Sequence, residues 1–135
     1  AIQTMVEGLL TLGLLQGSAA EGIESGAYMQ FCPHKSCHWL GLDVHDVGDY
    51  RVADDWRPLQ PGMVLTVEPG LYIAADTSIY ATNRYSKTAE STLQNSKGTG
   101  IRIEDDVLIT DAGCEVLTHR VPKTAGAIEA LMSAS

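Results

Sequence analysis

The chain has 135 residues, of which 44% are hydrophobic and 19% are charged, and its formal net charge is −8 at pH 7. This length suits one domain with a modest core, and the composition excludes disordered, collagen-like and membrane-spanning chains. Because lysine and arginine are scattered along the sequence, no cationic stripe is available for phosphate groups. We therefore expect neither nucleic acid nor membrane as a partner. Three cysteines are too few for a disulfide framework and predict a reducing compartment, the cytoplasm.

The first part of the chain is expected to be helical. Apolar residues recur at helical spacing over residues 2–15, Gly17-Ser18 ends the pattern, and a short second helical turn is expected at 19–26. Residues 37–47 are rich in β-forming side chains and predict one or two short strands. A loop with several prolines and aspartates is expected over 48–62.

The rest of the chain is expected to consist mainly of strands. Alternation predicts a strand at 63–67, and a Pro-Gly turn separates it from a second strand at 71–73. The polar residues 74–98 have no clear period and predict a long surface loop. The remaining expectations are a strand or strand pair over 101–109 interrupted at Asp105-Asp106, a turn at 111–113, a short strand at 115–117 and a helix at 122–132. This order predicts an α+β fold with a curved, mostly antiparallel sheet and flanking helices.

Three polar side chains stand in otherwise apolar strand-like segments. Glu68 ends the strand at 63–67, Glu104 shares a strand face with Arg102, and His38 precedes Trp39. Two carboxylates and an imidazole from separate strands form a suitable donor set for a hard or borderline divalent metal ion. Each residue also has a simpler interpretation, because strand-end glutamates are usually solvated, exposed Arg-x-Glu pairs contribute little, and histidines beside tryptophan usually pack.

A second metal hypothesis is a zinc site. Four potential ligands fall within seven residues, namely Cys32, His34, Cys37 and His38. Structural zinc sites usually use two ligand pairs separated by a longer loop, and no second pair follows here. Cysteines buried as small apolar residues are the favoured interpretation.

Three ordered motifs resemble those of aminopeptidase P, the family of Xaa-Pro aminopeptidases. They are residues 34–48, beginning His34-Lys35-Ser36-Cys37-His38, residues 59–73, containing Thr66-Val67-Glu68-Pro69-Gly70, and residues 100–106, beginning Gly100-Ile101-Arg102-Ile103-Glu104. Residues 128–132 resemble the family's C-terminal helix. The resemblance implies the pita-bread fold that this family shares with methionine aminopeptidases and creatinases.

The resemblance also implies a metal centre. His38, Glu68 and Glu104 match metal ligands, with Glu104 bridging two divalent ions. The family usually works with manganese, and cobalt or zinc can occupy related sites. The implied reaction is hydrolysis of the N-terminal Xaa-Pro peptide bond by a water that the two metals activate, in a peptide with proline at its second position.

Catalytic and substrate-binding roles follow from the same resemblance. Glu68 matches the residue that moves the proton of the water towards the leaving nitrogen. His45 matches a histidine that contacts substrate and stabilises the developing oxyanion. His34 matches a histidine near the substrate, and Arg102 matches an arginine that supports the site.

The sequence departs from the family pattern in three places. Two aspartate ligands are expected upstream of the first motif, but no Asp precedes Asp43; Lys35 stands where a glycine is usual; and residues 74–99 look longer than the family's loop. We therefore expect residues 1–135 to be the C-terminal part of a single pita-bread catalytic domain, without its upstream half or the N-terminal domain. The isolated chain should then be weak or inactive, and its apolar surface should favour a homo-oligomer.

Two alternative functions stay open. A prolidase- or creatinase-like hydrolase would use the same fold, since fold alone does not set the substrate. A non-catalytic pita-bread module would bind peptides without cleaving them. The presence of all three expected ligands argues against the non-catalytic module.

Overall fold

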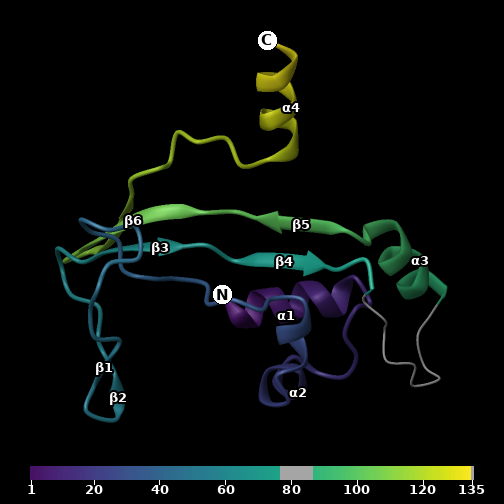
Figure 1. The fold of residues 1–135 in the computed structure, drawn as a ribbon, viewed down its shortest axis with the longest axis horizontal. Helices are drawn as coiled ribbons and strands as arrows, with labels where there is room; N and C mark the ends of the chain where they lie inside the picture. The colour runs from purple at the N-terminus through teal and green to yellow at the C-terminus, as the bar shows by residue number, and fades with distance from the viewer. Residues whose placement is uncertain (77–86, 135) are drawn as a thin grey trace. The chain divides into compact units, whose positions relative to one another are not determined.

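The computed structural model describes residues 1–76 and 87–134, which fall into two compact units. Unit 1 comprises Ala1–Ser36 and Pro69–Arg102, and unit 2 comprises Cys37–Glu68 and Ile103–Ser135. Each unit thus combines two separate stretches of chain, whose elements are labelled in Figure 1. The chain passes between the units three times, at Ser36-Cys37, at Glu68-Pro69 and at Arg102-Ile103.

Unit 1 begins with short helices. They are α1 (Ile2–Thr11), α2 (Ala19–Glu24) and the 3-10 turn η1 (Ala27–Gln30). The first helix is shorter than the expected 2–15, because Gly13 takes a φ of 74° in the left-handed region that ends helices. Ser18 and Glu21 form a capping box at the start of α2. Hydrogen bonds from the backbone and then the hydroxyl of Ser18 lower the pKa of the Glu21 carboxyl.

The rest of unit 1 is a β-hairpin-like pair and a helix. Strand β4 (Gly70–Ile73) pairs antiparallel with β5 (Thr99–Arg102), and α3 (Lys87–Ser96) precedes β5. The expected loop at 74–98 is therefore wrong for α3, while residues 77–86 of that loop lie outside the described residues. Helix α3 has no clear apolar period in its sequence, because it is polar and Leu93 is its buried residue among those described. The core of unit 1 contains Val6, Leu9, Leu14, Leu15, Phe31 and Leu93.

Unit 2 is built on a three-stranded antiparallel sheet in the order β3-β6-β7. Its strands are β3 (Val64–Val67), β6 (Asp105–Thr110) and β7 (Gly113–Val116). Leu65 on β3 lies opposite Val107 on β6, and both side chains are buried. Helix α4 (Ala125–Ser133) follows, capped by the Thr124 hydroxyl. The expected strands and the final helix are thus found with small shifts of their ends.

Two expectations for residues 37–62 are wrong. Residues 37–47 form no strand and contribute only the single bridge of Trp39 to Leu65. Their β-forming side chains, such as the fully exposed Leu42, gain no sheet neighbours within the described part of the chain. The expected loop at 48–62 contains a small hairpin of β1 (Arg51–Val52) and β2 (Asp55–Trp56).

The break in the strand pair at 101–109 lies at Ile103-Glu104 and not at Asp105-Asp106. The β4–β5 ladder ends at the pair Gly70–Arg102 and the β3–β6 ladder ends at the pair Val67–Asp105, so the pairing stops at the same place on both segments. Strands β3 and β4 follow each other along the chain and are separated by Glu68-Pro69, where proline has no backbone N–H to donate. Two glutamates are thereby left at the ends of the β3–β6 ladder.

The segment after β7 is fastened to the start of β6. Lys123 Nζ lies 3.0 Å from Asp105 Oδ1 and donates to the carbonyl of Thr118. The hydrogen bond from the Thr118 hydroxyl and then the contacts of Lys123 lower the pKa of the Asp105 carboxyl. These contacts hold the chain close to the residue that follows Glu104.

The cysteines and helices carry two further observations. Cys32, Cys37 and Cys114 are all unpaired, and Cys32 is buried as a small apolar residue would be. None of the helices within residues 1–76 and 87–134 combines the length and hydropathy that a bilayer crossing requires.

Candidate metal centre

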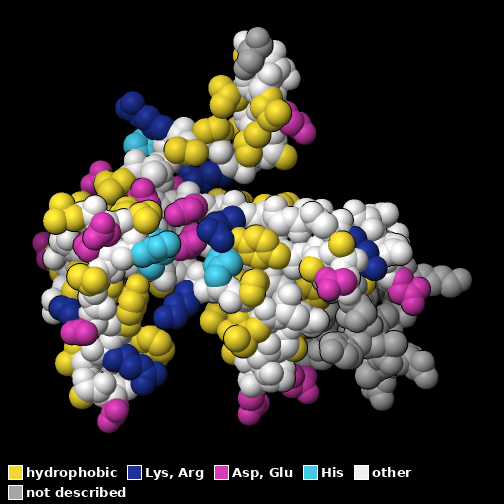
Figure 2. Space-filling model, viewed as in Figure 1, with side chains coloured by type: hydrophobic (Ala, Val, Ile, Leu, Met, Phe, Trp, Pro, Cys, Tyr) yellow, Lys and Arg dark blue, Asp and Glu magenta, His cyan; other side chains and the backbone are white. Residues whose placement is uncertain are grey.

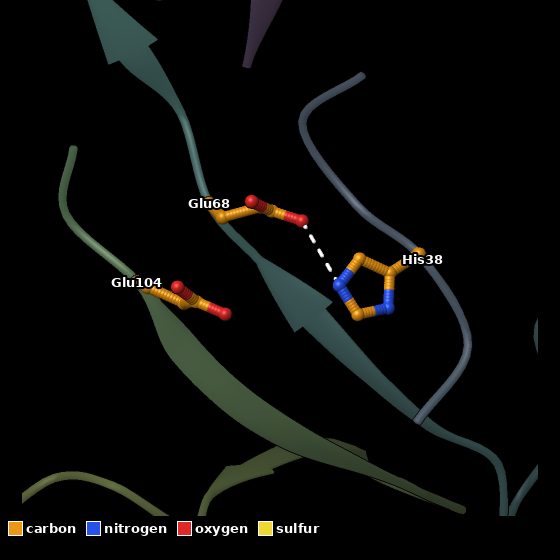
Figure 3. Close-up of side chains that lie close together, drawn as sticks. All are labelled: His38, Glu68 and Glu104. Carbon is orange, nitrogen blue, oxygen red and sulfur yellow. Dashed lines mark ion pairs between the residues drawn. The ribbon is translucent and has the colours of Figure 1, made fainter. Parts of the chain in front are cut away.

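His38, Glu68 and Glu104 come together in unit 2. Each offers one ligand atom, and these atoms lie within 4.8 Å of one another. Figure 3 shows the three side chains pointing towards a common space, with the glutamates on neighbouring strand ends and the histidine on the adjacent loop. Among the described residues this is the only group of three or more His, Cys, Asp or Glu side chains placed to share an ion. Glu68 is buried, His38 is half-buried and Glu104 is exposed.

The sheet itself brings the two glutamates together. Val67 opposite Asp105 is the last pair of the antiparallel β3–β6 ladder. The next residue along each strand is Glu68 on one side and Glu104 on the other, so continuation of the register sets them opposite each other. The expectation that these ligands lie within strands is therefore corrected: they stand just beyond the strand ends.

Backbone hydrogen bonds hold His38 beside β3 even though its segment is not a strand. The backbone N–H of Thr66 donates to the His38 carbonyl at 3.0 Å, and Leu40 N–H donates to Val64 at 3.1 Å. The Nδ1 atom of His38 lies 2.9 Å from the Trp39 carbonyl. In the tautomer with hydrogen on Nδ1, this bond fixes the ring and leaves the Nε2 lone pair as a ligand.

The donor set is suitable for a divalent ion. His38 Nε2 lies 3.1 Å from Glu68 Oε1. Two ligand atoms bound at right angles to one ion, each about 2.1 Å from it, are about 3 Å apart. A second carboxylate nearby adds negative charge that a cation would neutralise. The residues present thus fit a metal in distance and in chemistry.

His45, predicted to contact substrate, lies beside the same cluster. Its ring centroid is 4.5 Å from that of His38, with the planes 75° apart, and its side chain is exposed. The exposed imidazole of His45 beside His38 is open both to a substrate and to water.

His34 and Arg102 are brought together in unit 1 by a residue that the sequence did not single out. The Tyr72 hydroxyl accepts a hydrogen bond from Arg102 Nε at 2.8 Å and lies 2.9 Å from His34 Nε2. Because His34 Nδ1 lies 2.7 Å from the Lys35 carbonyl, its Nε2 can accept the hydroxyl hydrogen of Tyr72. The expectation that Arg102 and Glu104 share a strand face is wrong, because β5 ends at Arg102 and Glu104 lies outside it.

Glycines make room for Tyr72. A Cβ atom at Gly70 would lie 2.7 Å from the Tyr72 hydroxyl oxygen and 2.8 Å from His34 Nε2. A Cβ atom at Gly100, which lies opposite Tyr72 in the ladder, would lie 2.8 Å from its ring. The Gly70 of the Pro-Gly motif is thus a sequence signal for this close approach, although its target cannot be read without the register.

The zinc hypothesis gains no support. Both ring nitrogens of His34 contact Tyr72 or the Lys35 carbonyl. Within the described residues, Cys32, His34, Cys37 and His38 do not form a group that could share an ion.

The chain is similar to known metallopeptidases. The model of metallopeptidase family M24 matches residues 1–111. The Xaa-Pro aminopeptidase of Escherichia coli strain K12 is 48% identical over 134 residues, which cover 99% of this chain and 27% of that protein. The human Xaa-Pro dipeptidase is 41% identical over 144 residues, which cover 95% of this chain and 29% of that protein. The chain therefore spans little more than a quarter of the length of these relatives.

A solved structure supports the fold. The Pseudomonas aeruginosa aminopeptidase PepP matches with a TM-score of 0.85 and 50% identity, covering 98% of this chain and 27% of that one. The expected α+β class, as a portion of the pita-bread fold with antiparallel strands, is confirmed.

Proposed function

Since this chain belongs to metallopeptidase family M24, we propose that its full-length protein hydrolyses the N-terminal Xaa-Pro bond of peptides. The observation that carries the proposal is the convergence of His38, Glu68 and Glu104 within 4.8 Å. The relative from E. coli, named a Xaa-Pro aminopeptidase, supports the choice of bond.

In this proposal the three residues hold divalent metal ions, with Glu104 bridging two. Manganese is the proposed ion, and cobalt or zinc are alternatives with the same donor preferences. When bound, the ions would lower the pKa of a water molecule and polarise the scissile carbonyl. No Asp precedes Asp43 in these residues, so the two aspartate ligands of the family pattern would come from elsewhere in the full-length protein.

The proton transfers are assigned to this chain's own side chains. We assign to the Glu68 carboxylate the role of accepting the proton of the attacking water and delivering it to the proline nitrogen, and its burial at 7% exposure beside His38 supports this assignment. His45 is exposed beside His38 and would donate a hydrogen bond to the oxyanion that forms at the carbonyl.

Unit 1 would supply the supporting groups. We assign His34 to substrate binding and Arg102 to the support of the site through its hydrogen bond to Tyr72. Because Tyr72 contacts both residues, a displacement of its hydroxyl would disturb both at once.

A dipeptidase is the second candidate, and the 41% identity to the human Xaa-Pro dipeptidase favours considering it. The two activities differ in the length of the substrate beyond proline. Rates on Gly-Pro and on Gly-Pro-Xaa peptides, measured with the full-length protein, separate them: preference for the longer peptides supports the aminopeptidase, and preference for Gly-Pro supports the dipeptidase.

The proposal is tested by hydrolysis of a Xaa-Pro peptide with and without manganese. We expect turnover that needs the ion and that is lost in Glu104→Gln. A full-length protein that is saturated with manganese but hydrolyses neither class of peptide, while still binding peptides, would instead be the non-catalytic module.

The proposal also includes that the full-length protein forms a homo-oligomer and is located in the cytoplasm. Exposed apolar side chains gather on α4, namely Ile128, Leu131 and Met132 (Figure 2). A homo-oligomer would cover such a face, and light scattering of the full-length protein at several concentrations tests for it. The cytoplasm, expected from the cysteine content, is tested by fractionation of cells that express the protein.

A further inference from the structure

Thr66 is a buried polar residue of unit 2. Its side chain is 1% exposed, and it points to the same face of β3 as Glu68 two residues later. Within the described residues, Thr66 and Glu68 are the two polar or charged residues that are buried. Burial of a hydroxyl is unfavourable unless it forms hydrogen bonds, so the contacts of Thr66 need an explanation.

The hydroxyl of Thr66 links two of the three proposed ligands. Its Oγ1 accepts a hydrogen bond from the backbone N–H of His38 at 3.1 Å and donates to Glu68 Oε1 at 3.2 Å. The direction of both bonds is fixed, because an amide only donates and an ionised carboxylate only accepts. One buried hydroxyl therefore ties the carboxylate of Glu68 to the main chain of His38.

Packing alone does not account for this hydroxyl. Valine has nearly the same shape as threonine and is likewise enriched in strands, and it has no hydroxyl that needs a hydrogen-bond partner. The backbone link between the two segments is also independent of the side chain, since Thr66 N–H donates to the His38 carbonyl at 3.0 Å. Replacement by valine would thus keep the backbone link and remove only the two hydroxyl bonds.

We propose that Thr66 is a positioning residue of the metal centre, which holds the Glu68 carboxylate in register with His38 through its hydroxyl. This inference rests on the proposed function, because it assumes that both residues bind the ion. Without the hydroxyl, the Glu68 carboxylate would rotate more freely and the His38 N–H would lose this hydrogen-bond partner. Groups that orient metal ligands in this way contribute about 10- to 100-fold to metal affinity.

The experiment titrates manganese chloride into metal-free full-length protein by calorimetry. Thr66→Val is expected to bind manganese about 10- to 100-fold more weakly than the wild type. Thr66→Ser keeps the hydroxyl and is expected to restore most of the affinity, which a purely structural role of the methyl group would not do. Thr110→Val, at the far end of β6, is the matched control and is expected to bind as the wild type does.

Each outcome decides. Wild-type affinity in Thr66→Val, or equal weakening in the serine and valine variants, overturns the positioning role and leaves the metal centre intact. Absence of manganese binding in the wild type overturns the metal centre and the positioning role together. If Thr66→Val shows no cooperative thermal transition, Thr66→Ala replaces it under the same criterion, because alanine removes the hydroxyl without placing a methyl group against the carboxylate.

Discussion

Glu68 and Glu104 stand next to the last pair of one antiparallel ladder, so that two glutamates lie opposite each other where the pairing of β3 with β6 ends. The same break that ends hydrogen bonding between β3 and β6 leaves these side chains to converge with His38. Pro69 has no N–H to donate to the ladder, so the pairing ends beside Glu68, and the end of the ladder thereby forms part of the candidate site.

Facing carboxylates predict that a bound cation stabilises the fold. We expect manganese at about 100 times its dissociation constant to stabilise the full-length protein by about 2.7 kcal/mol, and EDTA to reverse the rise in melting temperature. Glu104→Gln should abolish the rise, whereas Glu115→Gln, another exposed glutamate of the sheet, should retain it. A rise of equal size in both variants contradicts the assignment of Glu104.

Replacement of His45 should separate catalysis from metal binding. Because its ring contacts that of His38 edge-on but is not among the three proposed ligands, His45→Ala is expected to bind manganese nearly as the wild type does. Loss of an oxyanion donor should lower kcat on a Xaa-Pro peptide by about 10²- to 10³-fold. His119→Ala, an exposed histidine of unit 2, serves as the control. A fall in manganese affinity that matches the fall in kcat would make His45 a ligand instead.

Tyr72→Phe tests the cluster in unit 1. The change removes the hydroxyl that accepts from Arg102 and contacts His34, and it leaves the ring in place. A lost hydrogen bond to a charged group costs about 1.5–3 kcal/mol, so kcat/KM should fall about 10- to 100-fold. Tyr28→Phe, on η1 of the same unit, should leave kcat/KM unchanged. Equal effects of the two changes would show that Tyr72 acts through packing.

Acid should weaken the start of α2. The pKa of Glu21 is lowered in the folded state, so its carboxylate stabilises the fold above the ordinary glutamate pKa of about 4.3. That contribution is lost as the pH falls through the lowered pKa. We expect Glu21→Gln to be less stable than the wild type at pH 7 in urea unfolding, with the difference closing towards pH 3. Glu24→Gln, at the helix end where the dipole disfavours a carboxylate, should show no such loss.

Local patterns in the sequence single out the residues of the candidate site, and they predict the structure around these residues only in part. Glu68 could be recognised because alternation over 63–67 and the Pro69-Gly70 turn are both local signals. The strands expected at 37–47 were wrong because β propensity depends on neighbours, and Leu42 in this segment is fully exposed. The proposed role of Thr66 could not be predicted from a local pattern, because it depends on a hydrogen bond to His38, which is far away in the sequence.

The role of Tyr72 and the place of the strand break could not be predicted from the sequence for a related reason. Tyr72 lies opposite Gly100, and only this register reveals why glycines surround its ring. The break at Ile103-Glu104 lies where the pairing of β5 with β4 ends and that of β6 with β3 begins. Its place depends on the register of the pairing, which no local pattern shows.

The most direct test of the metal centre is anomalous diffraction at the manganese edge from crystals of the metal-loaded full-length protein. We expect two peaks, with His38 Nε2 and carboxylate oxygens of Glu68 and Glu104 each about 2.0–2.3 Å from an ion, and with Glu104 contacting both. Occupied manganese peaks that none of these three side chains contacts would contradict the assignment.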